Sequence, residues 1–349
     1  MRHANVALFV PNNGCPHACS FCSQKSITGK SVQPGPADVI SAAETALSDL
    51  GAQAKSAELA FFGGSFTALE RNYMISLLEA AAPYVKGGSF AGIRLSTRPD
   101  AIDPEILSLL RDYGVTTIEL GAQSMDDHVL ALNERGHTAR QVKNASALIR
   151  NQGFSLGLQM MTGLYGDTPS GVFRTAEEIA SLSPDCVRIY PTIVLKGTKL
   201  GELFQRGEYS PPALEETVGL CAGLLDFFDE RRIPVIRLGL HASPELERDR
   251  LAGPWHPAFR ELCEGRRMLN RVIHHLTVSG VPKGQIVIRI NPRNASVAAG
   301  QKKCNLKALS ALGYFAVLEQ DAALSRRDFQ ICDAGGKRFA AEIAGTSGL

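Results

Sequence analysis

Short apolar runs of strand-forming residues alternate with longer amphipathic patterns along the first 240 residues of this 349-residue chain. This alternation is typical of parallel βα units, in which a helix carries the chain back to the starting edge of the sheet. The pattern predicts six such units and one further strand. The predicted strands are residues 6–10, 58–62, 92–97, 117–121, 155–160, 186–190 and 234–238, and the predicted helices are residues 37–50, 70–84, 104–113, 139–152, 172–182 and 212–231.

The character of the sequence changes after about residue 240, where charged and turn-forming residues become frequent. The pattern there predicts helices at 257–276 and 301–312 and strands at 285–290, 314–318 and 329–332. We therefore expect two domains. The first is a core of residues 1–245, and the second, residues 246–349, is a helical linker followed by a small α+β domain.

Three cysteines, Cys15, Cys19 and Cys22, follow the first predicted strand with the spacing C-x₃-C-x₂-C. Iron–sulfur clusters are held by cysteine thiolates, normally four of them. Three thiolates would leave one iron of a 4Fe–4S cluster without a protein ligand, and an open coordination position is what distinguishes catalytic metal sites from structural ones. The polar residues that follow the other strands would meet these cysteines, because parallel α/β barrels carry their active sites at the C-terminal ends of their strands.

The cysteine spacing, with Phe21 directly before the third cysteine, resembles the signature of the radical S-adenosylmethionine (radical SAM) enzymes. The resemblance implies an α/β fold, a partial (β/α)₆ TIM-like barrel, with a 4Fe–4S cluster on the three cysteines and SAM on the fourth iron. One alternative is a zinc site completed by a histidine such as His17, and another is a disulfide with one free thiol. Structural zinc sites usually add a second cysteine pair, which this sequence lacks.

A glycine-rich turn follows the second predicted strand at Gly63, Gly64 and Ser65. Glycines allow a ligand to approach the backbone closely. In the radical SAM enzymes a turn at the same place makes backbone hydrogen bonds to the methionine amino group of SAM. The resemblance therefore implies that these three residues bind SAM.

Gln123 ends the fourth predicted strand, and Arg135 lies twelve residues later. This separation is similar to that in oxygen-independent coproporphyrinogen oxidases, between a SAM-contacting glutamine and the arginine that pairs with the methionine carboxylate. Arginine suits this role because its planar fork meets a carboxylate through two hydrogen bonds. Ser96, Thr97 and Gln159, at the ends of the third and fifth strands, are candidates for ribose and adenine contacts, although those oxidases carry acidic residues at the corresponding places.

Several segments together resemble the radical SAM core of the Elongator catalytic subunit, over roughly residues 4–266. The acetyltransferase domain that follows this core in Elongator is not expected here, because no acetyl-CoA pyrophosphate loop is visible in residues 280–349. We expect a shorter bacterial relative with a C-terminal module of its own. The matching segments are residues 61–67, 96–100, 119–124, 188–191 and 252–259.

The net charge of +2 is unevenly distributed. From Arg271 to the end the chain has eleven Lys and Arg residues against five Asp and Glu, a balance of +6, whereas the preceding residues carry −4. A basic segment favours a polyanionic partner such as RNA, and it also fits the solvated surface of a small domain. The basic residues in question include Arg293, Lys302, Lys303 and Lys307.

The resulting hypothesis is an enzyme that cleaves SAM reductively to form a 5′-deoxyadenosyl radical and acts on tRNA or another RNA. One alternative is a small-molecule oxidase resembling the coproporphyrinogen oxidases, and another is a non-catalytic, cluster-bearing RNA-binding protein. Arg188 and Tyr190, at the end of the sixth strand, are candidates for substrate contacts. The chemistry implies a reductant protein such as flavodoxin or ferredoxin.

Eight cysteines without an apolar leader at the start of the sequence indicate a reducing compartment. We therefore expect a cytoplasmic protein. No apolar run approaches the roughly 18 residues of a membrane span, so no membrane partner is expected.

Overall fold

A computed structural model describes residues 4–11, 15, 19–23, 26–27, 32–326, 328–333 and 335–339. The chain forms two compact units, Met1–Thr217 with Phe227–Pro257, and Val218–Asp226 with Ala258–Leu349. Each is described here by itself. No helix in the described ranges is long and apolar enough to cross a membrane.

The first unit is built on a seven-stranded sheet with the order β1-β2-β3-β4-β5-β6-β8. Every neighbouring pair in this sheet is parallel, so the C-terminal ends of all seven strands lie along one edge. The sheet curls into a half-barrel, as the sequence predicts, and each predicted strand is confirmed to within two residues at either end. The strands are β1 (Ala4–Val10), β2 (Ala57–Gly63), β3 (Gly92–Thr97), β4 (Val115–Gln123), β5 (Ser155–Thr162), β6 (Cys186–Pro191) and β8 (Val235–Leu238).

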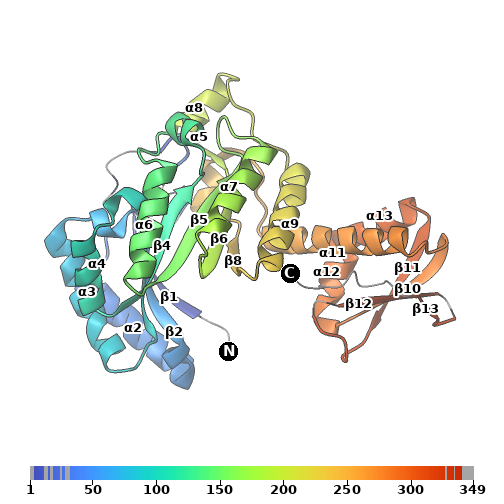
Figure 1. Ribbon diagram of the computed structural model, residues 1–349, viewed down its shortest axis with the longest axis horizontal. Coiled ribbons are helices and arrows are strands. Elements are labelled where there is room, and N and C mark those ends of the chain that lie inside the picture. Colours follow the sequence, from blue (N-terminus) through green and yellow to red (C-terminus); the bar gives the residue numbers. More distant parts are fainter. Residues whose placement is uncertain are drawn as a thin grey trace. The chain divides into compact units, whose positions relative to one another are not determined.

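Helices cover the outer face of this sheet, and Figure 1 shows α6 and α7 lying across β4, β5 and β6. Helices α6 and α7 contact β4 and β5, and strand residues such as Leu120 and Leu158 are buried, so the helices shield this face of the parallel sheet. The helices of this unit are α2 (Pro36–Leu50), α3 (Arg71–Lys86), α4 (Pro104–Asp112), α5 (Asp127–Leu132), α6 (Ala139–Asn151), α7 (Pro169–Ser181) and α8 (Lys199–Gln205). The next helix, α9 (Leu214–Glu230), is divided between the two units, because its residues Val218–Asp226 belong to the second.

The segment after β8 stays with the first unit as far as Pro257. It contains α10 (Pro244–Asp249) and β9 (Arg250–Ala252), which pairs antiparallel with β7 (Val194–Leu195). The Asp249 carboxylate accepts a hydrogen bond from the Ser26 hydroxyl at 2.8 Å. This segment therefore links the β6 side of the unit to the chain that follows the three cysteines.

The second unit combines one long helix with a four-stranded sheet of order β11-β10-β12-β13. Strands β10 and β11 are parallel, and the crossover between them carries two short helices that pack on the same core as α11. The core residues include Val272, Ile288 and Leu309. The elements are α11 (Phe259–Val278), β10 (Gly284–Ile290), α12 (Ala295–Ala299), α13 (Cys304–Ala311), β11 (Tyr314–Gln320), β12 (Phe329–Asp333) and β13 (Arg338–Phe339).

Four short helices, α5, α8, α10 and α12, are not predicted from the sequence. They have between five and seven residues, too few to show a helical period. Short helices are not stable on their own, so these four depend on local capping and packing. The Asp126 side chain, for example, accepts hydrogen bonds from His128 N and Val129 N at the start of α5.

Candidate active site

The cysteine segment is held in place at Ser20, which directly follows Cys19. The Ser20 hydroxyl donates to Asn133 Oδ1 at 3.0 Å, and its backbone N–H donates to Asn133 O at 3.1 Å. Asn133 Nδ2 in turn donates to the carbonyl oxygens of Val129 and Tyr165 at 2.8 and 2.9 Å. Because Ser20 and Asn133 are both fully buried, this pair holds the cysteine segment against the end of α5.

The three cysteines differ in environment: Cys15 is exposed, Cys19 is buried and Cys22 is half-buried. The Ser65 backbone N–H lies within hydrogen-bonding reach of the Cys15 thiol. Desolvation and the neighbouring Cys19 raise the pKa of the Cys15 thiol above its ordinary value, although Arg98 and Arg135 act in the opposite direction. Cys15 and Cys19 therefore belong to one site at the ends of β1 and β2, near Arg98 and Arg135.

Phe21 is buried in an apolar cluster beside this site. The cluster takes in Cys19 and the half-buried Cys22, and it separates both thiols from bulk water on one side. Aromatic burial of this kind contributes a large share of local packing energy. Its other buried members are Val129, Met161, Leu164, Val194, Leu200, Leu203 and Tyr209.

The described residues form no site for a single metal ion. Among the described residues, no three His, Cys, Asp or Glu side chains gather closely enough to hold one metal ion. A zinc ion requires such convergence, so the described residues give the zinc alternative no support, and its proposed ligand His17 lies outside them. All eight cysteines are free thiols, which contradicts the disulfide alternative.

The Gly63-Gly64-Ser65 turn follows β2 directly. Gly63 has φ +116°, and a Cβ there would lie 2.8 Å from the Val10 carbonyl oxygen, so glycine is required for the close approach of β1. The Gly64 N–H donates to Val10 O at 2.9 Å. The Ser65 hydroxyl is buried and bonded to Thr97 Oγ1 at 2.9 Å, so the turn presents backbone groups rather than this hydroxyl to a ligand.

Gln123 and Arg135 come together above Gly121. A Cβ on Gly121 would lie 2.9 Å from Gln123 Nε2 and 3.4 Å from Arg135 Nη2. Arg135 Nη1 donates to Cys19 Sγ at 3.1 Å, and Nη2 donates to Gly121 O at 2.7 Å. Gln123 has φ +65° at a register shift between β4 and β5. A non-glycine residue at positive φ stores strain that often marks a functional site.

Several buried polar atoms at this edge have no hydrogen-bond partner among the described residues: Gln123 Oε1, Arg135 Nε, Arg98 Nη1 and His137 Nδ1. Buried polar groups are nearly always paired in folded proteins, and leaving one unpaired costs about 1–3 kcal/mol. Their grouping next to Cys15 and Cys19 is the pattern expected of a site that completes its hydrogen bonds with a polar ligand.

The remaining predicted contacts lie deeper in the barrel. Gln159 Nε2 donates to Ser96 Oγ at 3.0 Å, joining β5 and β3. Thr97 is buried and its hydroxyl bonds to Ser65 and, at 2.6 Å, to Thr67 Oγ1. Thr97 therefore packs behind the glycine turn, whereas Ser96 and Gln159 face the interior of the half-barrel.

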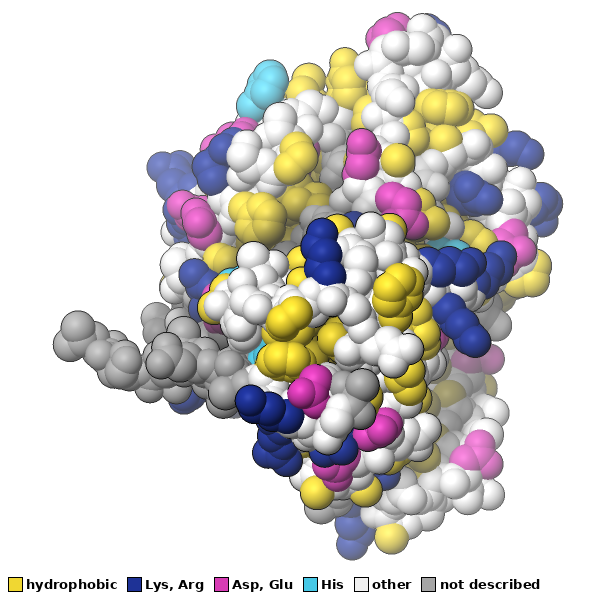
Figure 2. Space-filling model, turned by 90° about the vertical axis from the view of Figure 1, so that its right-hand side faces the viewer, with side chains coloured by type: hydrophobic (Ala, Val, Ile, Leu, Met, Phe, Trp, Pro, Cys, Tyr) yellow, Lys and Arg dark blue, Asp and Glu magenta, His cyan; other side chains and the backbone are white. Residues whose placement is uncertain are grey.

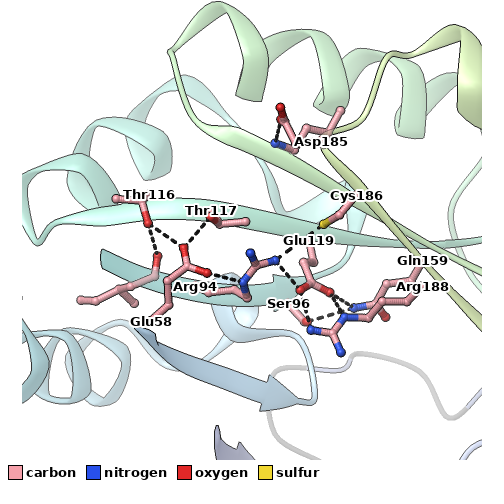
Figure 3. A network of polar contacts seen from close by, with 12 residues as sticks. Glu58, Arg94, Ser96, Thr116, Thr117, Glu119, Gln159, Asp185, Cys186 and Arg188 are labelled. Atoms are coloured by element: carbon pink, nitrogen blue, oxygen red, sulfur yellow. Dashed lines mark hydrogen bonds and ion pairs between the residues drawn. The ribbon is translucent and has the colours of Figure 1, made fainter. Parts of the chain in front are cut away.

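A network of buried ion pairs fills this interior (Figure 3). Glu119 is fully buried and receives hydrogen bonds from Arg188 Nε at 2.5 Å, Arg188 Nη2 at 2.8 Å and Arg94 Nη1 at 2.8 Å. Arg94 Nε also donates to Glu58 at 2.6 Å, and Gln159 donates to Glu119 at 2.9 Å. Arg188 lies 4.7 Å from the centre of the Phe62 ring. The network thus joins β2, β3, β4, β5 and β6.

Sequence reasoning missed most of this network and also Arg98. Arg98 and Glu119 lie within the family-like segments 96–100 and 119–124, but the sequence assigns neither a role. A signal does exist for the network, because Glu58, Arg94 and Glu119 stand inside otherwise apolar strands. A charged residue is almost never fully buried unless it is paired.

The comparisons with known proteins agree with this architecture. The family model of the radical SAM superfamily matches residues 9–179, and that of the Radical_SAM C-terminal domain matches residues 184–271. The chain therefore belongs to the radical SAM superfamily, a class of enzymes.

Among curated relatives, a tRNA uridine(34) acetyltransferase of Dehalococcoides mccartyi is 27% identical over 252 residues, covering 63% of this chain and 55% of that protein. Elongator complex protein 3 of Homo sapiens is 30% identical over 203 residues, covering 51% of this chain and 36% of that protein. The chain thus spans about half or less of the length of these relatives. The expected resemblance to the Elongator radical SAM core is confirmed.

A solved structure of Elp3 from the archaeon Methanocaldococcus infernus, lacking N-terminal residues, matches with a TM-score of 0.57 at 21% identity. The match covers 80% of this chain and 64% of that chain. At this identity the likeness concerns the fold.

Proposed function

We propose that this protein binds a 4Fe–4S cluster through Cys15, Cys19 and Cys22 and uses it with SAM. The observation that carries the proposal is the contact of Arg135 with Cys19, beside Gln123, with buried polar atoms left for a ligand to complete. When bound and reduced by one electron, the cluster and SAM supply methionine and a 5′-deoxyadenosyl radical that abstracts hydrogen from a substrate.

The protein's own residues bind and orient these groups. The Arg135 guanidinium offers a planar fork for the methionine carboxylate of SAM. Gln123 Oε1 is an acceptor for the amino group, beside the backbone groups of Gly63, Gly64 and Ser65. Ser96 and Gln159 remain candidates for ribose and adenine contacts.

The environment also protects the chemistry. The apolar cluster around Phe21 excludes water beside Cys19 and Cys22, and dry surroundings strengthen the electrostatic contacts of the site and limit side reactions. We expect a reductant protein such as flavodoxin or ferredoxin to supply the electron. An oxygen-sensitive cluster and eight free thiols favour the cytoplasm.

We further propose that the substrate is RNA, which rests on two supports. The printed names of the relatives give tRNA as their substrate. The second unit also carries exposed basic residues, Arg293, Lys302, Lys303 and Lys307, for which no ion pair occurs within the described ranges. Figure 2 shows Lys and Arg side chains in several small groups, with acidic side chains among them, so phosphate contacts would be made by separate groups rather than by one patch.

The experiment that tests the cofactor assignment is electron paramagnetic resonance of the anaerobically reconstituted and reduced protein. SAM bound at an open iron should change the cluster spectrum of the wild type. Arg135→Gln should require at least about tenfold more SAM for the same change, because a hydrogen bond to a charged group contributes about 1.5–3 kcal/mol. A spectrum that saturating SAM leaves unchanged would contradict the assignment.

A further inference from the structure

Arg98 is a buried arginine at the edge of the site that none of the predicted contacts uses. It directly follows β3 and is 3% exposed. Its backbone N–H donates to Ser65 Oγ at 3.1 Å. The residue is therefore tied to the glycine turn through its main chain.

The guanidinium of Arg98 is fixed by two partners. Nε and Nη2 donate to the two oxygens of Asp100 at 2.9 and 3.0 Å, a bidentate pair. Nη2 also donates to the Arg135 carbonyl oxygen at 2.7 Å. Arg98 thus holds the backbone of the residue whose side chain reaches Cys19.

The third nitrogen, Nη1, is buried and has no partner in the described part of the chain. Arginine carries five N–H donors in a rigid fork and cannot lose its charge. Because Asp100 and Arg135 orient the rest of the fork, Nη1 cannot turn to a new partner without breaking these bonds. A bound group that offers an acceptor would complete the hydrogen bonds of this guanidinium.

The charge of Arg98 also reaches the cysteine site. Arg98 Nη2 donates to the carbonyl oxygen of Arg135, and Arg135 Nη1 donates to Cys19 Sγ at 3.1 Å, so both positive charges belong to the cysteine edge of the sheet. Reduction of an iron–sulfur cluster adds negative charge, and the reduction potential depends on nearby charge and on hydrogen bonds to the sulfurs. A fixed positive charge beside the cysteine site would make reduction of the cluster easier.

We propose that Arg98 is a positioning residue for SAM: it holds Arg135 in place and presents Nη1 as a second cationic donor to the anionic end of the cofactor. This inference rests on the proposed function. It adds a residue that is not among the predicted contacts. Arg98 would have two effects: it would hold Arg135 in position for SAM, and its positive charge would influence the reduction potential of the cluster.

The test compares Arg98→Gln, Arg98→Lys and wild type in the full chain with the cluster reconstituted. The dissociation constant for SAM and the midpoint potential of the cluster are both measured. Arg98→Gln should raise the SAM dissociation constant about ten- to a hundredfold and shift the potential to a more negative value. Arg98→Lys should restore the potential, because the charge returns, but not the affinity, because lysine lacks the fork.

Arg71→Gln is the matched control. Arg71 is exposed and pairs with the exposed Glu105 at 2.9 Å, so its loss should change neither quantity. In an Arg135→Gln background, Arg98→Gln should weaken SAM binding much less than in wild type, because residues that act through one another are not additive.

Three outcomes would decide against the inference. These are an Arg98→Gln protein with wild-type affinity and potential, full additivity with Arg135→Gln, and an Arg98→Lys protein with wild-type affinity. If Arg98→Gln does not fold, as judged by circular dichroism, Arg98→Lys still carries the test. A wild-type protein that takes up a cluster but binds no SAM would instead contradict the proposed function.

Discussion

Gly121 shows how a single residue shapes the site. Two polar side chains, those of Gln123 and Arg135, lie where a Cβ at Gly121 would project. The space left by this glycine therefore lets both reach the cysteine edge of the sheet. Gln123, two residues later, has a positive φ, which is a strained conformation for a residue other than glycine. At the scale of residues, the site depends on small and strained positions as much as on charged ones.

Gly121→Ala should therefore weaken SAM binding while leaving the fold intact. The added methyl group meets the ends of flexible side chains, which can move, but their movement takes Gln123 and Arg135 from their positions. We expect the SAM dissociation constant to rise at least about tenfold with little change in melting temperature. Gly219→Ala, where a Cβ would lie 3.6 Å from its nearest neighbour, is the control. Equal affinity in both variants would contradict this prediction.

His137 makes stability depend on pH. Burial lowers the pKa of His137 to about 4, and Arg135 adds to this effect. The folded-state pKa lies below the unfolded value of about 6.5, so the unfolded state binds more protons between these values. Stability is complete above about pH 6.5 and falls as the pH drops toward 4, by up to about 3 kcal/mol. His137→Gln should flatten this part of the profile in urea unfolding. Parallel profiles for the two proteins would contradict the assignment.

At the scale of elements, the strands of the half-barrel are tied together by charge as well as by hydrophobic packing. Burial would raise the pKa of Glu119, but Arg188 and Arg94 outweigh it and hold the pKa below its ordinary value. A buried carboxylate with three hydrogen bonds from two arginines fixes the spacing of β3, β4 and β6. Two of the predicted SAM contacts, Ser96 and Gln159, are joined to this network, because Gln159 donates to both Ser96 and Glu119.

Glu119→Gln should destabilise the protein by about 3–5 kcal/mol, because it leaves Arg94 and Arg188 buried with less charge compensation. Chemical denaturation measures this value. Glu105→Gln removes an exposed ion pair to Arg71 and should cost less than about 1 kcal/mol. A loss below 1 kcal/mol for Glu119→Gln would show that the network does not hold the strands.

Much of this architecture could be predicted because each strand of a parallel sheet is an apolar run that ends in glycine or a polar residue. The positions of Cys15, Gly63 and Gln123 at one edge follow from that alternation alone. The Arg98–Arg135 contact could not be predicted, since it joins a side chain to a backbone carbonyl 37 residues away. The same holds for the Ser20–Asn133 pair, 113 residues apart. Neither leaves a periodic signal in the sequence.

At the scale of the whole molecule, the excess positive charge and the cysteine site lie in different parts of the chain. The cysteine site lies in the first unit, whereas the surplus of +6 lies from Arg271 onward. Phosphate contacts position nucleic acid without specifying its sequence. The basic residues of the second unit would therefore contribute affinity for RNA, and the first unit would contribute the chemistry.

Lys302→Gln combined with Lys303→Gln should weaken binding to bulk tRNA and make it less dependent on salt. Each lost phosphate contact reduces the log–log slope against salt by about 0.7–0.9, so the pair should reduce it by about 1.5. Lys55→Gln with Lys86→Gln, at the opposite edge of the first unit's sheet from the cysteines, is the control and should change little. Absence of any wild-type binding at about 50 mM salt would contradict the RNA proposal.

The most direct test of the central claim is SAM cleavage by the reconstituted protein. Wild type with a full cluster, dithionite and SAM under anaerobic conditions should release 5′-deoxyadenosine. Cys19→Ala should release none, whereas Cys304→Ala, which removes an exposed thiol of the second unit, should match wild type. A fully loaded wild type that forms no 5′-deoxyadenosine, or a Cys19→Ala protein that forms it normally, would contradict the account.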